Sequence, residues 1–123
     1  PGSHASPFGG NPLACAASAA VFEVIESEGL LDNTTKMGNY AFEQIRSMAK
    51  ELDVIKEVRG IGLMIGIELK IPAAEVVKKC MDEGLLLNCT HDPVIRVMPQ
   101  LNITKEHIDE GLGILKNILK SVN

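Results

Sequence analysis

The stretch Val54-Ile-Lys-Glu-Val-Arg-Gly-Ile-Gly-Leu-Met-Ile-Gly-Ile-Glu-Leu69 decides the fold, because it is rich in β-branched residues and broken by glycines. It predicts two short antiparallel strands, Val54–Val58 and Ile61–Leu69, divided by Arg59-Gly60. Its glycines superficially resemble a nucleotide-binding loop. They do not form the pattern G-x-G-x-x-G, however, and a strand rather than a helix follows them. We therefore interpret them as glycines that permit a tight turn or close packing of strands.

Two helices are expected before this stretch. Asn11-Pro12 is typical of an N-cap followed by proline at the first helical position, which predicts a helix over residues 12–28 that ends at Gly29. This helix carries no charged residue before Glu23, a pattern typical of a helix buried in a core or against a partner. Apolar residues at helical spacing predict a second helix over about 31–51.

After this stretch the chain passes through helix and strands once more. We expect a helix that begins at Ile71-Pro72, strands over Leu85–Asn88 and Val94–Val97 joined by a turn at Asp92-Pro93, and a last helix capped by Thr104. The order is then helix, helix, strand pair, helix, strand pair, helix. This order predicts an α+β fold in which an antiparallel sheet carries helices on one face.

Composition excludes several classes of function. The chain has 123 residues, 46% of them hydrophobic, and a net charge of −4 without a block of like charges, so we expect no binding of nucleic acid or of an anionic membrane. The longest apolar run, Pro12 to Phe22, is shorter than the ~20 residues that a membrane span needs. There is no signal-peptide pattern. Three cysteines indicate free thiols in a reducing cytoplasm, and no metal site is expected because zinc-ligand spacing is absent.

Two features are candidates for a binding site. Arg96 lies inside the apolar run Val94–Pro99, where its neighbours favour a desolvated setting. It is either an edge-strand arginine that reaches solvent or a structural carboxylate, or a planar fork that grips a substrate carboxylate. The loop His4–Pro12 combines Ser6 with glycines before a helix start. It is either an anion site or a tight interdomain turn.

Three stretches, Gly2–Cys15, Val58–Leu69 and Ile95–Glu106, occur in an order that resembles the C-terminal part of the class III pyridoxal-phosphate aminotransferases. The similarity extends from Gly2 to the last helix and is closest to the acetylornithine aminotransferases. It implies an active-site loop and long linking helix over residues 1–29, followed by residues 30–123 as the small C-terminal domain of a fold-type-I transferase.

The resemblance also implies roles for individual residues. In this family the loop before the linking helix reaches pyridoxal 5'-phosphate and substrate in the neighbouring subunit of a homodimer. Ser6 matches the serine of that loop, whereas Pro7 replaces the usual threonine and offers neither a hydroxyl nor an N–H group. Arg96 matches the arginine that binds a substrate carboxylate, and Gln100 replaces a proline of the same motif. No lysine here matches the catalytic lysine, which lies upstream in the family, so we expect this chain alone to be inactive.

The implied reaction is transfer of an amino group from N-acetylornithine to 2-oxoglutarate, in arginine biosynthesis in the cytoplasm. One alternative keeps the chemistry and changes the amine donor to ornithine, 4-aminobutyrate or another ω-amine. The other is a non-enzymatic α+β binding module that uses its apolar first helix as a partner surface.

Overall fold

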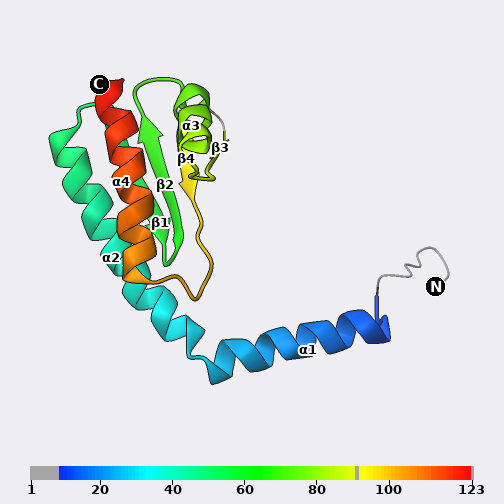
Figure 1. Ribbon diagram of the computed structural model, residues 1–123. Coiled ribbons are helices and arrows are strands. Elements are labelled where there is room, and N and C mark those ends of the chain that lie inside the picture. The colour runs from blue at the N-terminus through cyan, green and yellow to red at the C-terminus, as the bar shows by residue number, and fades with distance from the viewer. Residues whose placement is uncertain (1–8, 91, 123) are drawn as a thin grey trace. The chain divides into compact units, whose positions relative to one another are not determined.

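The computed structural model describes residues 9–90 and 92–122. Ser6, Pro7 and the predictions that involve His4 and His91 therefore lie outside the described residues. The chain divides into two compact units, residues 1–31 and 32–123. The elements in chain order are α1 (Pro12–Ser27), α2 (Leu30–Glu51), β1 (Ile55–Ile61), β2 (Met64–Leu69), α3 (Ala73–Asp82), β3 (Asn88–Thr90), β4 (Val94–Val97) and α4 (Lys105–Ser121) (Figure 1).

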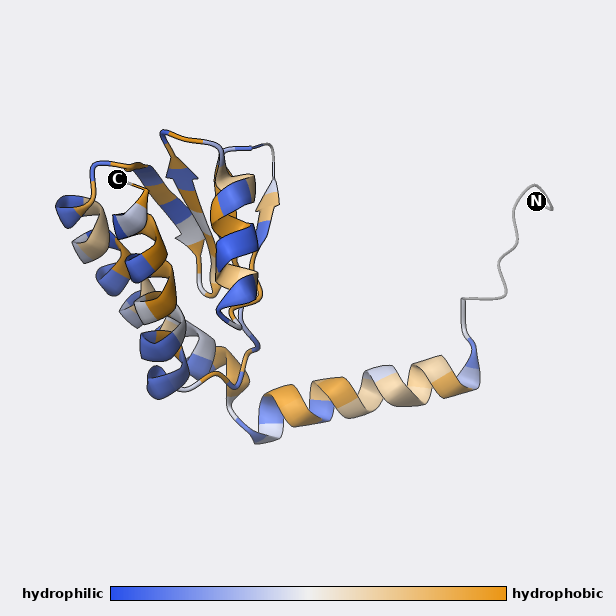
Figure 2. Cartoon of the chain, turned by 45° about the horizontal axis from the view of Figure 1, so that its top comes forward, coloured by the Kyte–Doolittle hydropathy of each residue, from blue (hydrophilic) through white to orange (hydrophobic). Residues whose placement is uncertain are grey.

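Helix α1 begins and ends as the sequence predicts. The Asn11 side chain accepts hydrogen bonds from the N–H groups of Leu13 (3.0 Å) and Ala14 (3.3 Å), and Gly29 follows the helix at φ 62°. Figure 2 draws α1 largely in the hydrophobic colours, yet none of its residues is buried and Phe22 is 69% exposed. The expected burial in a core is therefore not found among the described residues. None of the helices described could cross a membrane.

The second unit is a four-stranded antiparallel sheet in the order β1-β2-β4-β3. Alternate residues of the strands meet α2, α3 and α4 in one buried cluster, which confirms the predicted α+β fold. Its most buried side chains are Ile65, Ile67, Leu69 and Ile95 from the sheet and Ile45, Val76, Cys80, Leu115 and Leu119 from the helices.

The predicted position of the first hairpin turn is wrong. The strands meet at Gly62 and Leu63, with Ile61 paired to Met64, whereas Arg59-Gly60 lies within β1. A two-residue hairpin turn needs a residue with positive φ at its first central position, and Gly62 supplies it at φ 53°.

The third strand starts later than the predicted Leu85–Asn88, because Leu85 takes part in the C-terminal cap that follows α3. Its N–H donates to the Cys80 carbonyl (2.8 Å), and the N–H of Gly84 donates to that of Met81 (3.0 Å). With Gly84 at φ 85°, this is the Schellman arrangement that ends many helices. Strand β3 therefore starts only at Asn88.

Helix α2 passes very close to the hairpin turn. A Cβ atom added at Gly38 would lie 2.5 Å from the carbonyl oxygen of Gly62 and 2.6 Å from its carbonyl carbon. Both of these are backbone atoms, so the clash could be relieved only by moving the helix or the hairpin. Glycine at position 38 is therefore a requirement of this contact.

We predict that Gly38→Ala lowers the free energy of unfolding by about 1–3 kcal/mol, because overpacking outweighs the better helix propensity of alanine. Urea unfolding followed by circular dichroism measures this change. The control is Gly113→Ala in α4, where a Cβ meets nothing within 4 Å and alanine should add up to about 1 kcal/mol. Equal effects of the two substitutions would contradict the close contact.

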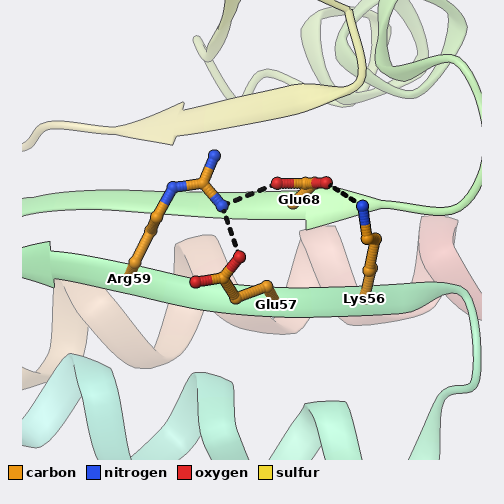
Figure 3. Close-up of polar contacts among 4 residues, drawn as sticks. All are labelled: Lys56, Glu57, Arg59 and Glu68. Atoms are coloured by element: carbon orange, nitrogen blue, oxygen red, sulfur yellow. Dashed lines mark hydrogen bonds and ion pairs between the residues drawn. The ribbon is translucent and has the colours of Figure 1, made fainter.

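Strands β1 and β2 are also joined by charges on the face that the helices leave open. Glu68 accepts from Lys56 Nζ (2.5 Å) and from Arg59 Nη1 (2.7 Å), and Arg59 also donates to Glu57 (2.9 Å) (Figure 3). The Glu68 side chain is only 16% exposed. The hydrogen bond from Lys56, followed by that from Arg59, holds the pKa of Glu68 below its ordinary value of 4.5.

A carboxyl group with a lowered pKa in the folded state stabilises the fold above its unfolded pKa, and this stabilisation is lost as the pH falls through the folded pKa. We therefore predict that Glu68→Gln is less stable than the unchanged chain at neutral pH, and that the difference shrinks as the pH falls below 4.5. Urea unfolding across this range tests it. Asp53→Asn, which removes an exposed ion pair with Lys70, should have little effect. A loss that does not vary with pH would count against the network.

Candidate functional site

Four residues, one from each strand, form a row across the sheet. Arg59 of β1 pairs with Gly66 of β2, Gly66 pairs with Arg96 of β4, and Arg96 pairs with Asn88 of β3. Paired residues of neighbouring strands present their side chains on the same face of a sheet. The row therefore places two arginines on either side of a position that has no side chain.

This row lies on the face that the helices do not cover. Ile65, Ile67 and Ile95 are buried in the core, and side chains alternate along a strand, so Gly66 and Arg96 face the other way. Burial agrees with this assignment, because Arg96 is exposed directly beside the fully buried Ile95.

An open hollow of about 440 Å³ lies over this row. Its walls include the apolar side chains near the hairpin tip and the two arginines. The lining residues are Arg59, Gly60, Ile61, Met64, Ile65, Gly66, Thr90, Val94, Arg96 and Met98. The hollow can therefore offer positive charge to a ligand with an aliphatic body.

The two arginines differ in their partners. Arg59 is held by Glu68 and Glu57, and the hydrogen bond to Glu68 is the main reason why the pKa of Arg59 is raised. No carboxylate of the described residues pairs with Arg96. Its Nη2 atom lies 2.9 Å from Met98 Sδ, and a thioether sulfur is only a weak acceptor. The Arg96 fork is therefore open to an incoming carboxylate.

The sequence left two interpretations of Arg96, a structural or solvent-exposed arginine and a fork that binds a substrate carboxylate. Within the described residues, a structural carboxylate partner is not found. In this chain the alternation of β4 buries Ile95 and leaves Arg96 exposed, so the described residues do not supply the expected desolvated setting. Binding of a substrate carboxylate by Arg96 stays a prediction.

Among the described residues, the remaining candidates give no second site. Ser6 and Pro7, the positions predicted to face the cofactor, lie outside the described residues, and their roles stay predictions. His107 is exposed, with Nδ1 3.2 Å from the hydroxyl of its neighbour Thr104. Across residues 9–90 and 92–122, no group of three metal-ligating side chains comes together.

A smaller crevice of about 130 Å³ lies between α4 and residues 85–87. Its lining is almost entirely apolar, and His107 is the one titratable side chain among the described residues that line it. It offers no counter-charge for an anionic ligand, so the hollow over Arg96 is the better candidate.

Sequence reasoning missed two residues of this site, Arg59 and Gly66. The available signal was Ile61-Gly62-Leu63-Met64, because a two-residue turn at its centre places Arg59 opposite Gly66 by simple counting. The pairing of Gly66 with Arg96 has no such local signal, because α3 and β3 separate β2 from β4 in the chain.

Comparison with known sequences gives one consistent family. The class III aminotransferase family matches residues 1–119. The acetylornithine aminotransferase of Caldanaerobacter subterraneus subsp. tengcongensis is 45% identical over 99% of the chain, which covers 31% of that protein. The ornithine aminotransferase of Bacillus subtilis is 47% identical over 98% of the chain, which covers 30% of that protein.

Solved structures agree with the sequence comparison. The ornithine aminotransferase of Plasmodium yoelii superposes with a TM-score of 0.94 at 34% identity, over all of this chain and 33% of that one. The acetylornithine aminotransferase of Elizabethkingia anophelis gives a TM-score of 0.90 at 33% identity, over 98% of this chain and 33% of that one. The chain thus spans about a third of the length of its relatives, and it belongs to the class III aminotransferase family.

Proposed function

We propose that the complete protein is a pyridoxal-phosphate-dependent aminotransferase that moves an amino group from N-acetylornithine to 2-oxoglutarate. The observation that carries the proposal is the open guanidinium of Arg96, at the position where the family places an arginine for a substrate carboxylate. A planar fork binds both oxygens of a carboxylate at once, which fixes the orientation of the substrate as well as its position.

The cofactor supplies the electron sink that amino transfer requires. None of the described residues is assigned to its binding. We propose that Ser6 contacts the cofactor phosphate and part of the substrate in the neighbouring subunit of a homodimer, and that Pro7 contributes no hydrogen bond there. No lysine of this chain matches the family's catalytic lysine, so the activity is proposed for the complete protein and this chain alone is expected to be inactive.

We further propose that residues 1–29 form the active-site loop and linking helix, and that residues 30–123 form the small domain. The exposed apolar side chains of α1, among them Leu13 (80%) and Phe22 (69%), support a location against the remainder of a cytoplasmic homodimer. An arginine-biosynthetic role follows from the proposed donor.

Ornithine is the second candidate donor, because ornithine aminotransferases match this chain as well as acetylornithine aminotransferases do. Three ornithine aminotransferases are 47–48% identical to this chain, against 42–48% for five acetylornithine aminotransferases. The test is transfer to 2-oxoglutarate by the purified complete protein with each donor in turn. A higher kcat/KM for N-acetylornithine supports the proposal, a higher value for ornithine supports the alternative, and no transfer from either donor overturns both.

We predict that Arg96→Ala raises KM for 2-oxoglutarate about 10- to 100-fold, because hydrogen bonds between charged groups contribute about 1.5–3 kcal/mol. Arg96→Lys should recover only part of the loss, because lysine keeps the charge but not the fork. The control is Arg46→Ala, which removes an arginine that stacks over Phe42 on α2. Unchanged kinetics in Arg96→Ala would contradict the assigned role.

A further inference from the structure

The glycines of the β1–β2 hairpin are not equivalent. Gly62 occupies the turn at φ 53°. Gly60 has φ 151°, and a Cβ there would lie 2.1 Å from the carbonyl oxygen of Met64. Both positions therefore require glycine for reasons of backbone geometry.

Gly66 has neither constraint. Its φ lies outside the left-handed region, and a Cβ would meet its nearest neighbour, Val94 Cγ1, at the ordinary contact distance of 3.5 Å. A glycine inside a strand weakens the sheet, because it loses more conformational freedom on folding and has no side chain to pack. A Cβ atom at position 66 would therefore fit without displacing a neighbour, and a residue with a side chain there should stabilise the strand.

The position of Gly66 suggests another reason for the missing side chain. Gly66 is paired with Arg59 on one side and Arg96 on the other, and all three line the open hollow of about 440 Å³. A side chain at position 66 would rise between the two arginine residues, with its Cβ 3.9 Å from Arg59 Cγ. It would occupy the floor over which a ligand must lie to reach the Arg96 fork.

We propose that Gly66 determines substrate specificity: its empty position leaves room for the carboxylate end of a linear aliphatic substrate over β2, beside Arg96. Arg59, whose charge is already matched by Glu57 and Glu68, forms the opposite wall and does not compete for the carboxylate. This inference rests on the proposed carboxylate-binding role of Arg96 and adds the space that such binding requires.

The experiment measures binding of glutarate, an unreactive dicarboxylate, to the complete protein by calorimetry, together with the thermal midpoint Tm. Gly66→Leu should weaken binding about tenfold or more, because the new side chain collides with the ligand. Its Tm should equal or exceed that of the unchanged protein. Gly113→Leu adds the same side chain on α4, where nothing lies within 4 Å of the new Cβ, and should leave binding unchanged.

The outcomes separate this inference from the proposed function. If Gly66→Leu binds glutarate normally while Arg96→Ala does not, the role of Gly66 is overturned and the carboxylate site stands. If Arg96→Ala binds normally, the carboxylate site itself is overturned. A lower Tm with unchanged binding would make Gly66 a packing position and also overturn the inference.

If Gly66→Leu does not fold, Gly66→Ala replaces it in the binding experiment, because the alanine Cβ lies at ordinary contact distances from its neighbours. Weaker glutarate binding by the alanine variant supports the inference, and unchanged binding overturns it. Failure of the proposed function has a separate readout, which is absence of amino transfer in the unchanged protein.

Discussion

The close approach of α2 to the hairpin turn is the contact on which the arrangement of the sheet depends. Gly38 faces the backbone of Gly62 so closely that a single methyl group does not fit between them. A slip of one residue in a hairpin moves every side chain to the opposite face. The contact fits the register that is observed, in which Ile65 and Ile67 lie in the core and Gly66 lies on the open face.

The charges on the open face follow from the same register. On one side of β2, Arg59 is matched by Glu57 and Glu68, so the ion pairs connect the two strands and offer no charge to a ligand. On the other side, no carboxylate among the described residues reaches Arg96. The row thus contains Arg59, which is paired with carboxylates, and Arg96, which is not. Arg96 is therefore the better candidate for binding a ligand.

Local chemistry made several elements predictable. Asn11 caps α1 and Thr104 caps α4, as expected from side chains that satisfy the first free N–H groups of a helix. The errors arose where local patterns compete. Arg59-Gly60 is typical of a turn, but Gly62 provides the positive φ that the turn uses. Leu85 is typical of a strand, but it completes the C-terminal cap of α3.

The sequence by itself determined the order of elements, the α+β class, the family resemblance and Arg96 as a candidate, because caps, periodicity and motifs are local properties of the chain. Only the tertiary structure decided that Arg96 is exposed, that Arg59 is already paired and that Gly66 lies between them. These facts depend on the pairing of β2 with β4 across an intervening helix. Such pairing is set by the packing of the shared core, which no short segment encodes.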